Sequence, residues 1–234
     1  MSELPQPDVY EQELIYMPYR ESLRQVLEYL CSNSPRNASL LDVMCGPGYL
    51  LGMIASRRKD LRLKGVDIDE RYITHANAKY SLIDFESGNL LSWQPPEQYD
   101  VVVCTGALHH IPYEQQETAV KRMASMVKPE GIVLVSDCYV DDYLDETERK
   151  VAAAKLGYEY LRATILNGAP QQVVEETIDI LSNDVLMKEF KTSLRKRAEV
   201  FNRVFGDVLT IKNWPNFESE YGDYVSICRN SNRA

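Results

Sequence analysis

The chain has 234 residues, of which 44% are hydrophobic, with a formal net charge of −9 and an isoelectric point near 5. This length and composition fit one domain with a sizeable insertion and a proper hydrophobic core, and they argue against disorder. The acidic balance argues against nucleic acid as a partner, because backbone binding needs concentrated lysine and arginine. No run approaches the roughly 18 apolar residues of a membrane span, and the beginning, MSELPQPDVYEQE, is unlike a secretory signal. We therefore expect a soluble, cytoplasmic protein.

The cysteines and histidines give little support for disulfides or metal. Five cysteines stand at 31, 45, 104, 138 and 228, an odd number that is widely spaced and mostly within apolar runs. We interpret them as reduced, buried thiols. The three histidines at 75, 109 and 110 form no HxxxH pair, so we expect no metal site.

Residues 39–137 alternate short apolar runs with amphipathic ones, a pattern typical of βαβ units and a parallel sheet. The sequence KPEG at 128–131 predicts a turn before the last strand of this region. The predicted strands are 39–44, 61–67, 81–86, 99–104 and 131–137, and the predicted helices are 48–57, 70–79 and 113–127.

The alternation stops after residue 141, where about 60 residues predict helices without a strand between them. The first helix covers 143–166 and ends at the breaker NGAP, and the second runs to about 182. The third carries one apolar stripe that we interpret as core packing, made of Leu186, Phe190, Leu194, Phe201 and Phe205. Two strands, 207–213 and 221–228, predict an antiparallel hairpin through WPNFESE. Upstream, 14–30 predicts a single amphipathic helix rich in tyrosine.

Residues suited to ligand binding follow each predicted strand of the parallel region. In an open parallel sheet, ligands bind outside the carboxyl ends of the strands, near the point where the strand order reverses. These strand ends carry Cys45 to Gly48, Asp67, Gly88 with Asn89, Cys104 to Gly106, and Asp137.

The glycine loop after the first strand departs from the dinucleotide fingerprint G-x-G-x-x-G/A. Gly46 and Gly48 fit, but Leu51 stands at the third position and Gly52 comes one residue too late. The loop also lacks the lysine of a P-loop. Asp67 suits a ribose in either class, since one carboxylate can accept hydrogen bonds from two adjacent hydroxyls. The loop therefore favours a nucleoside ligand without phosphate.

Five segments, in this order and spacing, resemble the successive motifs of class I S-adenosylmethionine-dependent methyltransferases: LLDVMCGPGYLL, GVDIDE, SGNLLSW, YDVVVCTGALHHIP and MVKPEGIVLVSD. The resemblance covers 39–137 and extends more loosely to the terminal hairpin. It implies an α/β, Rossmann-like three-layer sandwich with a seven-stranded, mostly parallel sheet, an antiparallel last strand, and a helical insertion between strands 5 and 6. The implied domains are an N-terminal cap helix (1–36), a cofactor-binding core (37–140 and 206–234) and a helical lid (141–205).

The resemblance implies S-adenosylmethionine as cofactor, S-adenosylhomocysteine as product, and no metal. The glycine loop would approach the methionine part, Asp67 would hold the ribose hydroxyls, and Asn89 would face the adenine amino group. Asp67 could instead cap the next helix, for which Asp69 is the better candidate, and Asn89 could be an ordinary turn residue. The full set of implied cofactor contacts is Arg20, Asp42, Met44, Cys45, Gly46, Gly48, Asp67, Ile68, Asn89, Leu90, Cys104 and Thr105.

Met44 stands where the resembled family usually has glycine. A left-handed backbone would cost about 1–2 kcal/mol at a methionine, so we expect an extended conformation there. Pro47 is expected to hold Gly46 in an extended geometry too. The Met44 thioether would lie beside the cofactor's methionine end or turn into the core.

The acceptor side of the site is predicted from residues near the fourth and fifth strands and in the N-terminal helix. A hydroxyl acceptor needs a base that removes its proton, and His109, His110 and Tyr16 are the candidate catalytic residues. Arg20 could pair with the cofactor carboxylate. Each residue has a packing or surface role as its alternative. Tyr19, Asp137 and Tyr139 are the candidate contacts to the acceptor.

The resulting hypothesis is methyl transfer to an N, O or C atom of a small molecule held in an enclosed site. Two alternatives stay open. One is a tRNA wobble-uridine modifying enzyme of the same fold, with the basic run KTSLRKR at 191–197 as contact surface, although such a run is typical of a solvated helix face. The other is a non-catalytic cofactor-binding module. The lid helices could also form a homodimer contact.

Overall fold

The computed structural model describes residues 6–230, apart from the side chains of residues 7–9. The predicted cap domain (1–36) and the second core segment (206–234) therefore extend beyond the described residues at either end. Within the described part, no helix has the length and apolar content needed to cross a membrane.

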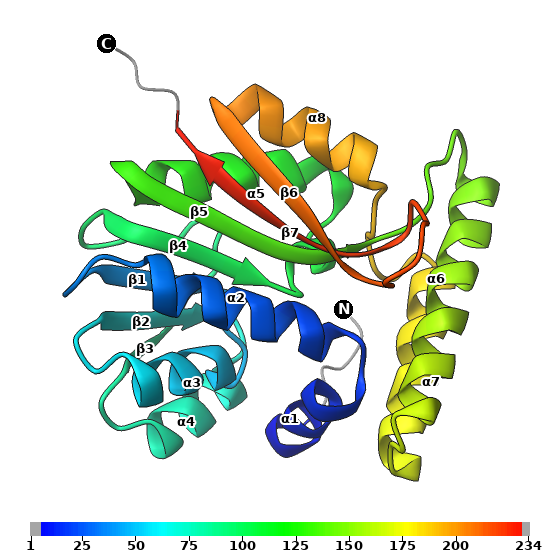
Figure 1. Cartoon of the computed structure of the whole chain (residues 1–234), viewed down its shortest axis with the longest axis horizontal. Coiled ribbons are helices and arrows are strands. Elements are labelled where there is room, and N and C mark those ends of the chain that lie inside the picture. Colours follow the sequence, from blue (N-terminus) through cyan, green and yellow to red (C-terminus); the bar gives the residue numbers. More distant parts are fainter. Residues whose placement is uncertain (1–5, 231–234) are drawn as a thin grey trace.

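The centre of the molecule is a seven-stranded sheet with strand order β3-β2-β1-β4-β5-β7-β6 (Figure 1). Neighbouring strands from β3 to β5 are parallel, and β7 is antiparallel to both of its neighbours. This arrangement confirms the predicted fold class. The strands are β1 (Ser39–Val43), β2 (Arg62–Asp67), β3 (Asp84–Ser87), β4 (Tyr99–Thr105), β5 (Val127–Tyr139), β6 (Asp207–Trp214) and β7 (Gly222–Arg229).

Helices cover both faces of this sheet because the central strands are apolar on both faces. Successive side chains of a strand point to opposite faces, so Leu40 packs in one core cluster and Leu41 in the other. The first cluster is covered by α2 (Tyr19–Asn33), α3 (Tyr49–Arg57) and α4 (Glu70–Lys79), and the second by α5 (Tyr113–Met126) and α8 (Leu194–Val204).

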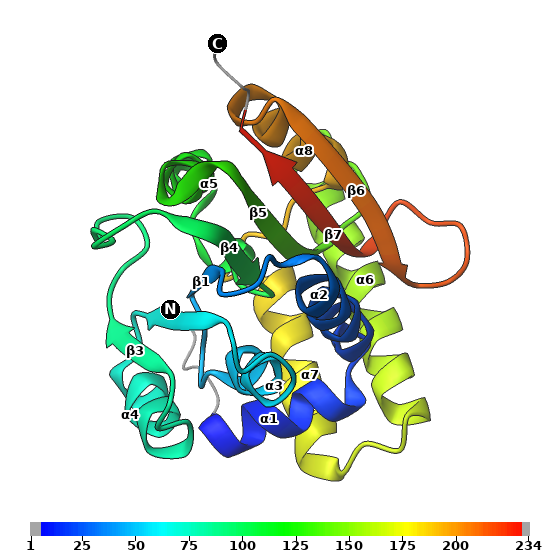
Figure 2. The same ribbon diagram turned by 60° about the vertical axis from the view of Figure 1, so that its left-hand side comes forward.

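Three helices stand beyond the carboxyl edge of the parallel strands. They are α1 (Pro7–Tyr16), α6 (Glu146–Leu166) and α7 (Gln171–Val185). Helices α6 and α7 pack against each other, and α1 lies against α7, as Figure 2 shows. These helices place a cap over the edge where ligands bind in such sheets.

The prediction of one continuous N-terminal helix over residues 14–30 is wrong. Two helices, α1 and α2, meet at Met17 and Pro18 instead. Met17 has an extended backbone (φ −73°, ψ 153°), because a residue before proline is pushed out of the helical region. The break turns α1 away from the sheet and towards α7.

Two further predictions needed correction. The third lid helix begins only at Leu194, where the Ser193 side chain accepts a hydrogen bond from Lys196 N, so Leu186 and Phe190 lie outside the predicted stripe. The KPEG segment lies within β5 rather than in a turn, because Val127 already pairs with Tyr99. A bulge absorbs the extra residues before Ile132 pairs with Val101.

Candidate functional site

The strand order reverses between β1 and β4, so the loops after these strands diverge at one point of the sheet edge. The loop after β1 contains Cys45 to Gly48, and the loop after β4 contains Gly106 and a short 3₁₀ helix, Leu108–His110. The sequence therefore places its glycines where a ligand can approach bare backbone.

The glycine loop has a left-handed backbone at three positions. Gly46 (φ 54°) and Gly48 (φ 81°) adopt it, and so does Met44 (φ 56°). The expected extended conformations of Met44 and Gly46 are therefore wrong. The Cys45 N–H donates to Val66 O (3.1 Å) and the Gly46 N–H to Asp67 Oδ2 (2.8 Å), and these bonds to β2 hold the loop in its turn.

The Met44 side chain is half-buried and packs against the core cluster that contains Leu90. Of the two orientations expected for its thioether, this contact is with the core. The position accepts methionine because the packing partly offsets a strain of about 1–2 kcal/mol.

Two carboxylates lie beneath the glycine loop. Asp42 is buried at the end of β1, and its Oδ1 has no hydrogen-bond partner among the described residues. Burial, and then the neighbouring Asp67, raise the pKa of Asp42 well above its ordinary value. Burial also raises the pKa of Asp67, although Asp69 N–H and Gly46 N–H donate to its carboxylate. Such a pair would be stabilised by a donor or cation above the loop.

Asp69, not Asp67, caps the following helix, since its side chain accepts from the Arg71 N–H (2.9 Å). Asp67 is therefore not used as the helix cap. Its Oδ2 accepts from the Gly46 N–H and its Oδ1 from the Asp69 N–H, and each oxygen retains a lone pair for a ligand hydroxyl.

The remaining predicted cofactor contacts differ in exposure. Ile68 is 51% exposed beside Asp67, where an apolar ligand face could cover it. Asn89 is exposed, and its Oδ1 accepts from the Leu91 N–H (2.9 Å), so it acts as a turn residue and keeps a lone pair. Leu90 is buried. Burial raises the pKa of both Cys45 and Cys104 well above the ordinary thiol value, which disfavours a thiolate nucleophile.

A cavity of about 580 Å³, partly open to solvent, lies between this sheet edge and the cap helices. Tyr10 and Tyr19 border both the cavity and the loops. A Cβ at Gly46 would lie 3.7 Å from the Tyr10 ring, and one at Gly106 would lie 3.0 Å from the Tyr19 ring. The Tyr19 hydroxyl is buried without a hydrogen-bond partner among the described residues. The cavity has the size of a small-molecule site.

His109 lines the cavity but is held by carboxylates on both sides. Its Nδ1 lies 2.6 Å from Asp137 Oδ1, and its Nε2 lies 3.4 Å from Glu189 Oε2. Burial alone would raise the pKa of Asp137, but the neighbouring His109 lowers it below the ordinary value. Both ring nitrogens thus face carboxylate oxygens of the protein, which fixes the orientation of the His109 ring.

His110 also lines the cavity, with its ring 4.3 Å from that of His109. About a third of its side chain is accessible. Burial, and then His109, lower the pKa of His110 to about 4. His110 is therefore neutral at pH 7, where it can accept a hydrogen bond but is a weak base.

The ligand atoms of His109, His110 and Glu189 lie within 4.8 Å of one another, as a metal site would require. However, the Lys191 ammonium lies 2.6 Å from Glu189 Oε2 and opposes a cation at this place. A second group adds Asp137 and Cys138 to His109, but burial raises the Cys138 pKa far above the range in which a thiolate forms.

Of the seven residues predicted for the acceptor side of the site, four do not line the cavity. Asp137 and Tyr139 are fully buried in β5, beneath the cavity rather than in it. Tyr16 contributes its backbone carbonyl as acceptor for Asn167 Nδ2. Arg20 is exposed and donates to Ile15 O (3.0 Å). The structure thus brings Tyr19, His109 and His110 together, and leaves Asp137, Tyr139, Tyr16 and Arg20 outside.

Tyr10, Glu13, Tyr160 and Glu189 line the cavity and were missed from the sequence. Proline at the start of a helix was a usable signal for α1, since Pro7 occupies its first position. Glu189 lies within the third lid helix that was predicted, in the segment that the structure places between α7 and α8, and no motif marks it. Tyr160 donates a hydrogen bond to Asp223, whose pKa burial raises to about 7.

The basic run 191–197 does not form a free cationic surface. Lys191 and Arg197 are buried, with Arg197 donating to Gln116 Oε1 (2.6 Å), and Arg195 pairs with Asp142 and Glu199. The predicted solvated helix face is therefore also incomplete, because two of its basic residues point inward.

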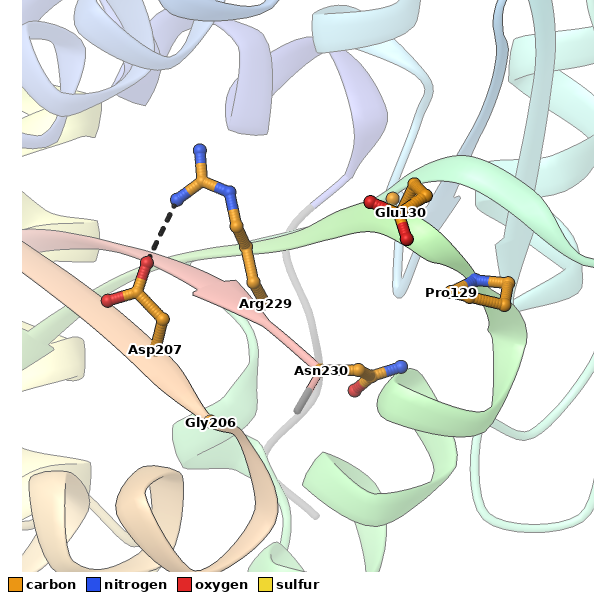
Figure 3. Close-up of a pocket in the computed structure, with 7 residues that line it drawn as sticks. Pro129, Glu130, Gly206, Asp207, Arg229 and Asn230 are labelled. Carbon is orange, nitrogen blue, oxygen red and sulfur yellow. Dashed lines mark hydrogen bonds and ion pairs between the residues drawn. The ribbon is translucent and has the colours of Figure 1, made fainter. Parts of the chain in front are cut away.

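A second hollow, of about 380 Å³, lies at the opposite edge of the sheet, as Figure 3 shows. Arg229 and Asp207 form an ion pair of 3.3 Å at its wall. The glycine loop and the cap contribute none of its lining residues. This hollow is therefore separate from the candidate site.

The residues at the sheet edge fit a nucleoside with an amino-acid tail. The unpartnered Asp42 oxygen, the exposed Ile68 and the left-handed glycine loop match an ammonium donor, an apolar ring and a close backbone approach, respectively. These are the groups that S-adenosylmethionine carries.

Comparison with known proteins points in the same direction. Residues 40–131 match the family described as "Methyltransferase domain". A trans-aconitate 2-methyltransferase of Sinorhizobium medicae is 28% identical over 129 residues, which cover 55% of this chain and 46% of that protein. The chain thus spans about half the length of that curated relative.

Two solved structures share the fold over nearly the whole chain. The N-methyltransferase NodS of Bradyrhizobium japonicum, in complex with S-adenosylhomocysteine, has a TM-score of 0.61 and 16% identity, covering 97% of this chain and 98% of that one. The magnesium protoporphyrin IX methyltransferase of Synechocystis, with the same bound product, has a TM-score of 0.63 and 17% identity, covering 95% and 94%. At such identities the likeness is one of fold.

Proposed function

Because this chain belongs to the class I S-adenosylmethionine-dependent methyltransferases, we propose that it transfers a methyl group from this cofactor to a small molecule bound in the cavity between the sheet edge and the cap helices. The observation that carries the proposal is the position of Tyr10 and Tyr19. Both rings border the cavity, and they also contact the glycines of the loops after β1 and β4. A cofactor on these loops and an acceptor in the cavity would then meet at the two tyrosines.

The cofactor contacts in this proposal follow the sheet edge. Asp42 would interact with the ammonium group, Gly46 and Gly48 would let the methionine part approach, and Asp67 would accept from the ribose hydroxyls. Ile68 and Asn89 would contact the adenine. Arg20 is not part of the proposed set, because it is exposed and bonded to Ile15 O.

The bound cofactor supplies an activated methyl group on a sulfonium sulfur, whose departure is intrinsically easy. The chain's own task is to orient the acceptor and exclude water, and orientation alone can lower a barrier by about 7–11 kcal/mol. The cap helices α1, α6 and α7 line the cavity, and a bound acceptor would displace water from the part that they cover. Asp137 and Glu189 hold the His109 ring, which would serve as a fixed wall beside the acceptor. His110 would accept a hydrogen bond from the acceptor molecule.

The tRNA alternative has no support from the described part of the surface. Its expected contact, the run 191–197, is occupied by internal ion pairs and hydrogen bonds. A cavity of about 580 Å³ favours a small molecule instead. A non-catalytic module would bind the cofactor but have no use for the second compartment.

The proposal is tested by calorimetric titration with S-adenosylmethionine and S-adenosylhomocysteine, beside NAD. We expect saturable binding of the first two and none of NAD. Asp67→Ala should weaken binding about tenfold or more, because it removes a charge-assisted acceptor from two hydroxyls. Asp84→Ala is the matched control, since this exposed carboxylate pairs only with Lys64 on the neighbouring strand. Equal affinity of Asp67→Ala and wild type would refute the ribose assignment, and absence of binding to wild type would refute the function.

A further inference from the structure

The wall of the cavity formed by α1 and α7 is acidic and has no cation of its own. Glu13 on α1 and Glu176 and Asp179 on α7 line it. Among the described residues, none forms an ion pair or hydrogen bond with these three carboxylates. Glu13 is only 6% exposed, and its buried Oε1 has no partner.

A buried carboxylate without a partner is unusual, because transferring it from water costs several kcal/mol. Burial, and then the facing Glu176, raise the pKa of Glu13 to about 8. Burial, and then Asp179, also raise the pKa of Glu176. A bound cation would reverse both effects and recover the energy of the unused acceptor.

Neither α1 nor α7 contains a lysine or an arginine. Lys191 pairs with Glu189 at 2.6 Å and lies 3.7 Å from Asp184, and the Arg149 guanidinium bonds to Asp184. Lys188, in the segment after α7, lines the cavity but is exposed, and it forms no ion pair with Glu13 or Glu176. Within the described residues, the wall formed by α1 and α7 therefore lacks a paired cation.

We propose that Glu13 and Glu176 form an ammonium subsite, and that the acceptor is a small molecule that carries a cationic amino group. The neighbouring Tyr10 and Tyr160 rings suit such a group through their aromatic faces, and Leu14, Met17 and Leu156 offer apolar contact to the rest of the molecule. The identification of the bound amine as the methyl acceptor rests on the proposed function. The ammonium subsite itself depends only on the residues that line the cavity.

The acidic wall does not suit the substrate for which one relative, the trans-aconitate 2-methyltransferase, is named. Trans-aconitate is a polycarboxylate, and the Glu176 and Asp179 carboxylates would repel it from this wall, where the protonated Glu13 offers no positive charge to offset the repulsion. An amine, by contrast, would supply the missing positive charge and N–H donors.

The test uses two probes of equal size, benzylammonium and benzyl alcohol, titrated calorimetrically into the full chain at pH 7 and up to tens of millimolar. We expect benzylammonium to bind about tenfold or more tightly than the alcohol. Glu13→Gln and Glu176→Gln should each remove most of this preference. Glu11→Gln is the matched control on the same helix, because Glu11 pairs with Lys79 and not with the cavity.

Proton release gives a second readout. The groups facing Glu13 are Tyr10 on its own helix, Tyr72 on α4, and Glu176 and Asp179 on α7. Both tyrosines stay protonated at pH 7, since burial raises their pKa values further. Ammonium binding should therefore release a proton from Glu13, visible as a dependence of the heat on buffer ionisation, and Glu13→Gln should abolish it.

Equal binding of the two probes to wild type, or no binding of either, would overturn the subsite. Unchanged preference in both variants would do the same. Failure of the proposed function looks different, since it would appear as missing affinity for S-adenosylhomocysteine. That affinity should be the same in wild type and Glu13→Gln, which also shows that the variant is folded.

Discussion

The two long walls of the cavity differ in whether their carboxylates form ion pairs. On the wall made by α6, the end of α7 and the segment after it, Asp184 pairs with Arg149 and Glu189 with Lys191. On the wall made by α1 and the middle of α7, Glu13 and Glu176 have no cation among the described residues. We call these the paired wall and the unpaired wall.

The difference separates a structural from a binding use of buried charge. Arg149 also donates to the Tyr113 hydroxyl (3.0 Å) and to Lys191 O (3.2 Å), so the paired wall ties α6 to the loop that carries Glu189. This loop in turn fixes His109. The unpaired wall makes no such ties, and its free acceptors make sense only with a ligand.

Breaking the paired wall should have the largest effect. Arg149→Met leaves Asp184 buried without its main partner, and we expect a loss of about 3–5 kcal/mol in the free energy of unfolding. Lys150→Met is the matched control, because Lys150 is exposed and pairs only with Glu146 one turn away. Urea unfolding followed by circular dichroism measures both. A loss below about 1 kcal/mol for Arg149→Met would mean that the paired wall is not a structural tie.

The unpaired wall should instead reveal itself through pH. The folded pKa of Glu13 lies near 8, above the ordinary 4.5, so the folded state holds a proton that the unfolded state releases between these values. Its contribution is therefore complete below about pH 4.5 and is lost as pH rises towards 8. Between pH 7 and 8, wild type should lose about 1 kcal/mol more than Glu13→Gln.

Subtraction of the variant isolates Glu13 from other groups. Asp223 acts in the same direction, but its pKa of about 7 places most of its effect below this window, and it is present in both proteins. His110, with a pKa lowered to about 4, acts at lower pH. Parallel stability curves for wild type and Glu13→Gln from pH 5 to 8 would show that Glu13 is not held protonated.

The contrast between the walls also marks where sequence-based prediction succeeded. The sheet was predictable because Leu40 and Leu41, and the valines of 101–103, carry the alternation of a strand buried on both faces. Asp69 was recognised as a helix cap from local sequence alone, and the cap geometry confirms it. In both cases the information is local.

The ion pairing of the two walls was not predictable from the sequence, since it depends on residues that are far apart in the chain. Arg149 and Asp184 are 35 residues apart, and Glu13 meets Glu176 only because the chain breaks at Pro18. The break itself could have been read from the proline. Which carboxylates then find a cation is decided by tertiary packing, and no motif records it.

The smallest expected effect concerns backbone strain, which occurs at two methionines. Met187 (φ 60°) lies in the loop of the paired wall, and Met44 (φ 56°) lies in the glycine loop. Glycine adopts this conformation without the clash of a Cβ, so Met187→Gly should stabilise the fold by about 0.5–1 kcal/mol. Met44→Gly should gain less, because the Met44 side chain packs against the core cluster of Leu90.

Thermal unfolding of both variants beside wild type measures this difference. Met44→Gly should leave cofactor affinity within about twofold of wild type, since the Met44 side chain packs on the core and the loop keeps its bonds to Val66 O and Asp67. A destabilised Met187→Gly would show that the paired wall selects this side chain for packing rather than tolerating its strain. A Met44→Gly gain equal to that of Met187→Gly would mean that the contact with the Leu90 cluster contributes nothing, and that methionine at this position only costs stability.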